Sequence, residues 1–286
     1  MQHYPGATLY VVATPIGNLA DITLRALHVL HLVQAIACED KRHTQPLLRQ
    51  YGIDKPLMAV HQHNEIEAAG GVVERLQRGE RVAYVSDAGT PAVSDPGARL
   101  VAAVRAAGFR VMPLPGASSV TAVLSAAGVT HASGSSDSSS SFVFAGFLPT
   151  KPGERDRAIE LLRTDTRAIV ILEAPHRIEA LAKALGVLQG RLVTVGRELT
   201  KQFEEIATLP AQDFSSWLDA GAQRTRGEFA LVLHASTAPE DLDDSLRVLK
   251  VLLAELPLKS AVKLAAQITS APRNDLYEAA LKFRNE

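Results

Sequence analysis

Short apolar runs alternate with amphipathic patterns through the first half of the chain, and this alternation constrains the fold more than any other feature. The runs are typical of strands, and helical patterns such as Leu19 to Val33 and Glu65 to Arg78 lie between them. The sequence therefore predicts an α/β domain at the start of the chain. Its five strand candidates are Leu9 to Ala13, Ala35 to Cys38, Leu57 to Val60, Val82 to Ser86 and Val111 to Pro113.

Glycine and proline mark the points where three of these strands give way to helices. Open α/β sheets bind ligands at the carboxyl ends of their strands. Glycine lets the backbone approach a ligand closely, and proline restricts the entry angle of a turn. Each turn alone could be an ordinary one, but three at successive strand ends suit an adenosyl group held by main-chain hydrogen bonds. The turns contain Pro15 and Gly17, Gly89 and Pro91, and Pro115 and Gly116.

A serine-rich run, Ala132 to Ser141, separates these strands from a second set. It has no apolar face to bury, so we expect a mobile loop that takes no part in catalysis. In the second set, Leu192 to Gly196 and Glu204 to Leu209 are joined by too few residues for a helix, which predicts antiparallel pairing. The second set comprises Phe142 to Ala145, Ala168 to Glu173, Leu192 to Gly196, Glu204 to Leu209 and Glu228 to His234.

From Ala238 the pattern changes to helices only. Pro257 and Pro272 divide this tail into pieces, and Ser260 and Asn274 are candidate N-caps. Three short helices with a tight turn fit either a helix-turn-helix or another small helical bundle. The helix candidates are Leu242 to Leu256, Ser260 to Ile268 and Arg273 to Phe283.

A chain of 286 residues is long enough for two domains and a short appendage. We expect an N-terminal α/β domain over residues 1–116, a second α/β domain over 117–237 and a helical domain over 238–286. No apolar run is long enough to cross a bilayer and the N-terminus lacks the features of a signal peptide, so the expected location is cytoplasmic. The single cysteine, Cys38, predicts a buried strand thiol and excludes an internal disulfide.

Several enzyme classes are disfavoured by motifs that the sequence lacks. It has no G-x-x-x-x-G-K-[ST], no G-x-G-x-x-G after the first strand, no H-E-x-x-H and no G-x-S-x-G. His61 and His63 have no nearby carboxylate or third histidine to complete a metal site, so we expect no metal. The net charge of −1 argues against a protein that coats nucleic acid through bulk charge, and any RNA contact must come from local patches.

Six short stretches form a further pattern when they are taken together. They are Ala13 to Ile22, Ala37 to Asp40 with Arg42 to Thr44, Ser86 to Pro91 with Ser94 to Gly97, Gly146 to Pro149, Glu173 to Arg177, and Gly196 to Lys201. In combination they resemble the ribosomal RNA small subunit methyltransferase I family of the tetrapyrrole methylase superfamily. The resemblance runs from about Leu9 to His234, and the tail is similar to the family's helix-turn-helix-like domain.

The resemblance implies two α/β domains with S-adenosylmethionine in the cleft between them, and a homodimer. It also implies methyl transfer to the 2′-hydroxyl of a cytidine in the decoding region of 16S ribosomal RNA, in the assembled 30S subunit. The serine-rich segment Ser133 to Ser141 departs from the family, in which this loop is shorter. Carried over by position, the cofactor contacts are Pro15, Ile16, Gly17, Asp87, Ala88, Gly89, Thr90, Val93, Ser118, Ser119, Leu172, Arg197, Gly227, Glu228, Phe229 and Ala230.

Methyl transfer from a sulfonium to a ribose hydroxyl requires in-line positioning, and a base near the weak nucleophile assists it. Glu39 and Asp40 could instead cap the helix that follows them, and Glu173 could pair with Arg177 at a helix start. A histidine could stack on a nucleobase rather than take a proton. The base is therefore left open among Glu39, Asp40, His43, Glu173, His176 and Lys201.

Basic side chains in these stretches are candidates for RNA contacts, because guanidinium and ammonium groups bind phosphate without reading sequence. A solvated surface charge is the alternative for each of them. The candidates are Arg42, Lys151, Arg155, Arg177 and Lys201.

Two other functions stay open at this point. A methyltransferase of the same superfamily that acts on a tetrapyrrole or a protein side chain would share the cofactor cleft. A non-catalytic RNA-binding assembly factor on an α/β scaffold would bind ribosomal RNA without S-adenosylmethionine.

Overall fold

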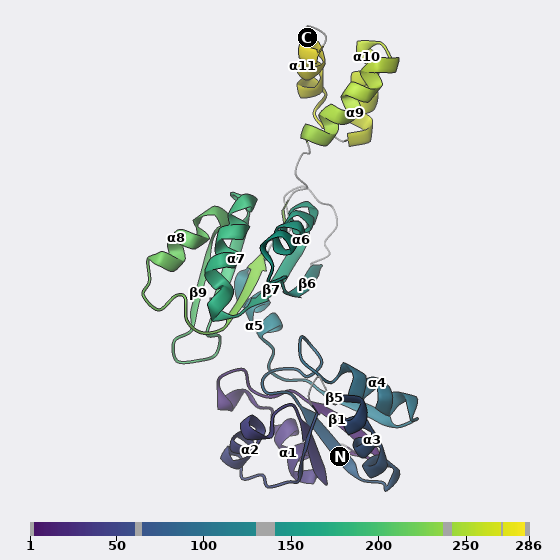
Figure 1. The fold of residues 1–286 in the computed structure, drawn as a ribbon, viewed down its shortest axis with the longest axis vertical. Coiled ribbons are helices and arrows are strands. Elements are labelled where there is room, and N and C mark those ends of the chain that lie inside the picture. Colours follow the sequence, from purple (N-terminus) through teal and green to yellow (C-terminus); the bar gives the residue numbers. More distant parts are fainter. Residues whose placement is uncertain (1–2, 61–64, 130–140, 237–241, 270, 284–286) are drawn as a thin grey trace.

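The computed structural model describes residues 3–60, 65–129, 141–236, 242–269 and 271–283. These residues form two five-stranded sheets with flanking helices, followed by three helices at the C-terminal end (Figure 1). The predictions for His61 and His63, and for all of the serine-rich segment except Ser141, lie outside the described residues. Among the described helices, none is both long enough and apolar enough to cross a membrane.

The first sheet is parallel throughout and has the strand order β3-β2-β4-β1-β5. Each strand alternates its side chains between two faces, so that Tyr10 packs toward α1 and α2 while Leu9 packs toward α3 and α4. The strands are β1 (Thr8–Val12), β2 (Ala35–Cys38), β3 (Leu57–Ala59), β4 (Arg81–Val85) and β5 (Arg110–Leu114). The helices are α1 (Leu24–Leu32), α2 (Lys41–Gln50), α3 (Glu65–Gln77) and α4 (Ala98–Ala106).

The order of the strands determines where a ligand crevice can form. Strands β1 and β4 are neighbours, but the chain leaves β1 through α1 on one face and leaves β4 through α4 on the other. A crevice opens beyond the carboxyl ends of two strands whose connections diverge in this way. The predicted α/β domain is confirmed, and Cys38 is a fully buried strand thiol as expected.

One predicted helix is wrong in its extent. The pattern from Leu19 to Val33 forms a 3-10 turn, η1 (Leu19–Asp21), and then the separate helix α1. Two caps explain the break: the Asn18 side chain accepts a hydrogen bond from the Ala20 N–H at 3.0 Å, and Thr23 accepts one from the Ala26 N–H at 3.0 Å. Each cap starts a new helix because it satisfies N–H groups that a continuous helix would already have paired.

The second sheet is mixed and has the order β6-β7-β10-β8-β9. Strands β6 and β7 are parallel, and the other pairs are antiparallel, including the β8–β9 hairpin that the short connection predicts. Its strands are β6 (Phe142–Phe147), β7 (Ala168–Glu173), β8 (Leu192–Arg197), β9 (Glu205–Pro210) and β10 (Phe229–Leu233).

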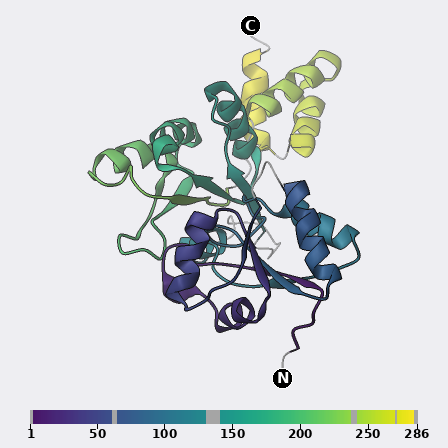
Figure 2. The same ribbon diagram turned by 60° about the horizontal axis from the view of Figure 1, so that its bottom comes forward.

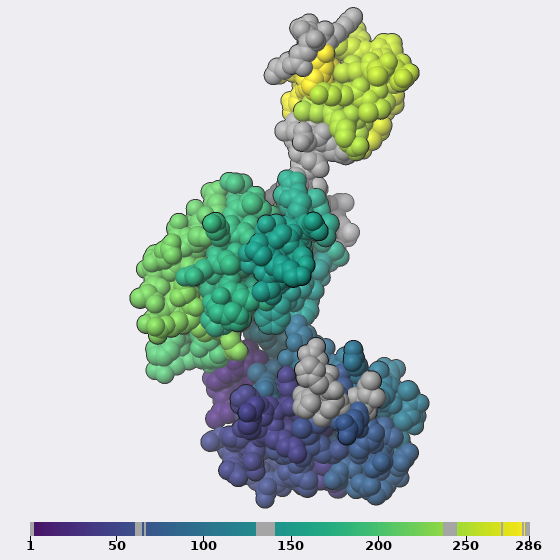
Figure 3. All heavy atoms as spheres, in the orientation of Figure 1, coloured from purple at the N-terminus to yellow at the C-terminus, as the bar shows by residue number. Residues whose placement is uncertain are grey.

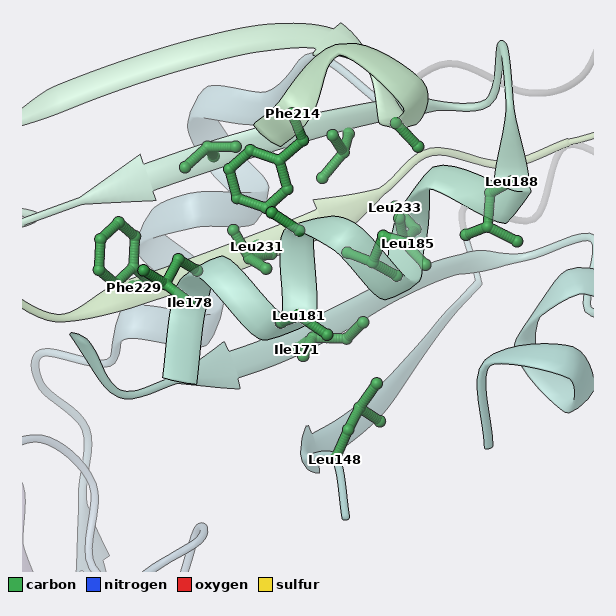
Figure 4. Close-up of a cluster of buried hydrophobic side chains, with 14 of the residues drawn as sticks. Leu148, Ile171, Ile178, Leu181, Leu185, Leu188, Phe214, Phe229, Leu231 and Leu233 are labelled. Atoms are coloured by element: carbon green, nitrogen blue, oxygen red, sulfur yellow. The ribbon is translucent and has the colours of Figure 1, made fainter. Parts of the chain in front are cut away.

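Helices cover both faces of this second sheet. On one face, α5 (Ser119–Ala127) packs through Val123. On the other, α7 (Ile178–Leu185) and α8 (Phe214–Asp219) pack on the strands together with α6 (Pro152–Thr164). Figure 4 shows Leu181 and Phe214 from these helices over Leu231 of β10. The face that α5 covers is the one that lies toward the first sheet.

The tail consists of α9 (Leu242–Glu255), α10 (Leu258–Thr269) and α11 (Arg273–Phe283). They share a core of their own, and Figure 3 shows the tail as a separate lobe. The N-cap predictions for Ser260 and Asn274 are wrong, because α10 and α11 begin earlier. The carbonyls of Pro257 and Pro272 accept from N–H groups of the first turns instead, at 3.0 Å from Ala261 and 3.2 Å from Leu276. In Figure 2, α11 lies at the opposite end of the molecule from the first described residues of the chain.

Candidate functional site

The three glycine- and proline-containing turns form one hydrogen-bonded unit. Thr14 and Gly89 exchange two backbone hydrogen bonds, of 2.9 Å and 3.1 Å, which join the turns that follow β1 and β4. The Thr90 hydroxyl donates to the Ala117 carbonyl at 3.1 Å and joins the turn that follows β5. Gly89 has a φ of +77°, which a residue with a Cβ adopts only under strain. The turns therefore converge as their positions at strand ends predict.

A cavity of about 280 Å³ lies between this unit and the second sheet. Its volume is near the lower end of the roughly 300–1,000 Å³ of small-molecule sites. The first sheet contributes Gly89 and its neighbours, and the second contributes Leu172 of β7 and Ala230 of β10. The two sheets come close here: a Cβ on Gly146 of β6 would lie 3.4 Å from the Ser94 hydroxyl. The cavity is therefore a site that neither sheet forms alone.

Lys201 lines this cavity as a fixed cation. Its Nζ donates to Glu198 Oε1 at 2.7 Å and to Glu228 Oε2 at 2.6 Å. Partial burial acts to lower the pKa of Lys201, but hydrogen bonds to the two carboxylates outweigh it and raise the pKa. An ammonium held in this way keeps its proton and cannot serve as a base. Lys201 was predicted as a candidate base and as a candidate RNA contact. The geometry disfavours the base and leaves a positive charge at the cavity.

Glu173 faces away from the α5 side of its sheet. Alternation along β7 places Ile171 and Glu173 toward α7, whereas Leu172 packs toward α5. The Glu173 side chain is fully buried, and its Oε1 accepts from the Ala174 N–H at 2.9 Å and lies 3.0 Å from Arg177 Nε. Arg177 also donates to the Leu148 carbonyl. The pair anchors the start of α7, as a structural role for Glu173 and Arg177 predicts, and Glu173 also contributes to the lining of the cavity.

Comparisons with known proteins are consistent with this architecture. The family model for tetrapyrrole (corrin/porphyrin) methylases matches residues 8–215, and the model for the RsmI C-terminal HTH domain matches residues 239–284. Ribosomal RNA small subunit methyltransferase I of Pseudomonas aeruginosa is 46% identical over 96% of this chain and 97% of its own length. The protein of that name from Escherichia coli O157:H7 is 44% identical over 96% of this chain and 94% of its own length. The chain belongs to the ribosomal RNA small subunit methyltransferase I family.

Solved structures share the fold at low identity. Diphthine synthase aligns with a TM-score of 0.60 at 15% identity, over 79% of this chain and 90% of its own. Uroporphyrin-III C-methyltransferase of Thermus thermophilus, crystallised with S-adenyl homocysteine, aligns with a TM-score of 0.52 at 17% identity, over 79% of this chain and 96% of its own. These structures support the two-sheet fold, and the HTH match favours the helix-turn-helix alternative for the tail.

Most of the cofactor contacts implied by the family resemblance do line the cavity. Four of the others do not line it but are chain neighbours of residues that do, namely Pro15, Gly17, Asp87 and Gly227. Arg197 lies elsewhere, because its buried guanidinium donates to the carbonyls of Arg226 and Phe203 at 2.8 Å and 3.2 Å. The predicted residues that line the cavity are Ile16, Ala88, Gly89, Thr90, Val93, Ser118, Ser119, Leu172, Glu228, Phe229 and Ala230.

The candidate bases of the second family stretch lie at the carboxyl end of β2, beside the cavity rather than in its lining. Asp40 caps α2 by accepting from the Arg42 N–H at 2.7 Å, and its hydrogen bonds with the Arg42 side chain lower its pKa to about 2. Asp87 Oδ2 lies 2.9 Å from His43 Nδ1, and this hydrogen bond raises the pKa of His43. Burial raises the pKa of Glu39. Asp40 therefore acts as a helix cap, while His43 is oriented by a carboxylate.

The cations predicted to contact RNA separate into exposed and buried groups. Arg42 and Lys151 have side chains 88% and 80% exposed, paired only with Asp40 and Glu154 among the described residues. Arg155 is only 8% exposed, and the Arg177 side chain only 17%. Burial removes these two from the surface that a phosphate could reach. His176 is exposed in the short turn η2 (Pro175–Arg177).

The sequence interpretation missed several residues in the cavity lining, most importantly Asp95. The stretch Ser94 to Gly97 was among those that resemble the family, so the signal was present, but no role was assigned to its carboxylate. The lining residues that were not predicted in any role are Ser94, Asp95, Val120, Phe147, Ala174, Pro175 and Leu199.

Proposed function

We propose that this protein transfers a methyl group from S-adenosylmethionine to the 2′-hydroxyl of a cytidine in the decoding region of 16S ribosomal RNA. The observation that carries the proposal is the cavity between the paired turns and the second sheet, found in a chain whose relatives are named ribosomal RNA small subunit methyltransferase I. Uroporphyrin-III C-methyltransferase, which shares the fold, binds S-adenyl homocysteine, the demethylated form of this donor.

The residues of the cavity fit such a donor. Ala88, Gly89, Ser118 and Ser119 have small side chains, so backbone groups are accessible to adenosine and methionine atoms. Ile16 and Leu172 offer apolar surface to the adenine ring. When bound, the donor supplies an electrophilic methyl on a sulfonium. The chain supplies a rigid wall, excludes water and holds the acceptor in line, which is worth roughly 7–11 kcal/mol in well-oriented reactions.

RNA is held by local charge in this proposal, because the net charge of the chain is only −1. Arg42 beside the first sheet and Lys151 beside the second are exposed enough to contact phosphates. The helical tail, which matches the HTH model, adds a second RNA-binding element. We further propose the assembled 30S subunit as substrate, a cytoplasmic homodimer, and domain boundaries after residues 116 and 237.

The proposal is tested by methylation with tritiated S-adenosylmethionine. The acceptors are 30S subunits from cells that lack the gene, protein-free 16S ribosomal RNA and a precorrin substrate. We expect label in 30S subunits, with mass spectrometry placing it on one cytidine ribose. Label in the precorrin alone would refute the proposal in favour of a tetrapyrrole methylase. Binding of ribosomal RNA without calorimetric binding of S-adenosylmethionine would refute it in favour of an assembly factor.

A further inference from the structure

The loop after the second paired turn holds a carboxylate against the cavity. Ala92 and Ser94 have φ values of +65° and +61°, a backbone conformation that non-glycine residues adopt only under strain. The far end of the loop is anchored, because the buried Tyr84 hydroxyl donates to the Pro96 carbonyl at 2.7 Å and the buried Glu65 accepts from the Gly97 N–H. The strained loop is thereby held in one shape, and that shape brings Asp95 to the cavity.

Asp95 differs from the other ionisable side chains of the cavity lining. Lys201 and Glu228 are paired with each other, and Glu173 is buried against Arg177. Asp95 forms no salt bridge with any residue that the structure describes. Asp95 therefore remains available to accept a proton, whereas Glu228 is paired with Lys201 and Glu173 is paired through Oε1 with Arg177.

We infer that Asp95 is the general base that removes the proton from the acceptor ribose hydroxyl. The inference rests on the proposed methyl transfer. As the ribose oxygen bonds to the methyl carbon, the carbon–sulfur bond breaks and its electron pair stays on sulfur. The hydroxyl proton passes to the Asp95 carboxylate, so the sulfonium charge and the carboxylate charge disappear together.

The surroundings of Asp95 suit this role. Burial raises the pKa of Asp95 to about 6, and repulsion from Glu39 at the end of β2 and from Asp87 after β4 acts in the same direction. A hydrogen bond from the Ser86 hydroxyl partly opposes this rise. Glu65 of α3 contacts the same loop through the Gly97 N–H, and Arg99 of α4 lies 3.9 Å from Glu65. A carboxylate with a pKa near the working pH is a stronger base than an ordinary one and is still ionised at neutral pH.

The test compares Asp95→Asn with Asp54→Asn, which changes an exposed carboxylate between α2 and β3 that does not line the cavity. Affinity for S-adenosylmethionine is measured by calorimetry, and single-turnover methylation of 30S subunits is measured between pH 5 and pH 9. We expect Asp95→Asn to bind the donor within about threefold of wild type and to lose roughly 10²–10⁴ in rate. Asp54→Asn should match wild type in both.

A third variant separates a base from a merely structural residue. Glu39→Gln removes a charge that raises the pKa of Asp95, so the acid limb of the wild-type rate profile, expected near pH 6, should move to lower pH. Asp95→Asn with wild-type rates, or a rate loss matched by an equal loss of donor affinity, would overturn the inference. A wild type that binds the donor but methylates no 30S subunit would instead refute the proposed function.

Discussion

Gly17 and Lys201 meet across the two halves of the fold. A Cβ built on Gly17, in the turn after β1, would overlap the Lys201 side chain that extends from the loop after β8. The same lysine is held by Glu198 and Glu228. A glycine in the first turn therefore leaves the space that the Lys201 side chain occupies in the cavity lining.

Gly17→Ala should push Lys201 out of this position. Because the displaced ammonium would lose its hydrogen bonds to Glu198 and Glu228, we expect affinity for S-adenosylmethionine to fall by about tenfold, equivalent to about 1.4 kcal/mol. Isothermal titration calorimetry measures this directly. Gly70→Ala is the control: this glycine is exposed in α3 with open space around it, and alanine there should stabilise the helix by roughly 0.5–1 kcal/mol. Equal donor affinity in both variants would contradict the predicted role of the Lys201 position in donor binding.

Gly89→Val should abolish donor binding while most of the protein stays folded. At a φ of +77° a branched side chain is strained, and a Cβ would lie 3.3 Å from the Ile16 side chain, which would have to move away from it. Gly52→Val is the matched control, because Gly52 has a similar φ of +67° but open space around it, at the end of α2. We expect both variants to lose stability and only Gly89→Val to lose calorimetric binding. A wild-type Kd for Gly89→Val would show that the turn is not part of the site.

Asp95→Asn should make the protein more stable at neutral pH. The folded state keeps the Asp95 proton up to a pKa of about 6, whereas an ordinary aspartate has a pKa of 3.8. Between these values the folded state binds more protons, so this group lowers stability as the pH rises from about 4 to 6. Asparagine removes that cost, which we put at about 1–2 kcal/mol at pH 7.5, because solvent screens a half-buried carboxylate. Urea denaturation at pH 7.5 and at pH 4.5 should show a gain that shrinks at the lower pH, and a loss of stability at both would contradict the prediction.

Arg177→Ala should destabilise the second sheet. It would leave the fully buried Glu173 carboxylate without its cation, a change that typically costs 3–5 kcal/mol. Arg163→Ala, which removes an exposed pair with Glu160, should cost less than about 0.5 kcal/mol. Denaturation monitored by the fluorescence of Trp217, which packs against the core of this sheet, distinguishes the two. Similar losses in both variants would mean that the Arg177 pair is not a structural anchor.

The strands and the turns between them were predictable because their signals are local. Period-two burial, helical periodicity and glycine at strand ends are visible within short windows, so nearly every strand was placed within a residue or two. The helix boundaries were less predictable where a cap depends on a single side chain. Asn18 and Thr23 break one predicted helix, and the prolines at 257 and 272 start two others earlier than serine and asparagine would.

The sequence by itself determined the family, the two sheets and the three turns that meet at the cavity. Only the tertiary structure decided which charged side chains face it. Glu173 and Asp95 both lie in stretches that resemble the family and both line the cavity, yet Glu173 is paired with Arg177 while Asp95 forms no salt bridge with any residue that the structure describes. The reason is physical: a side chain's partners come from elements distant in sequence, here Arg99, Glu65 and Tyr84 around one loop, and no local pattern encodes that meeting.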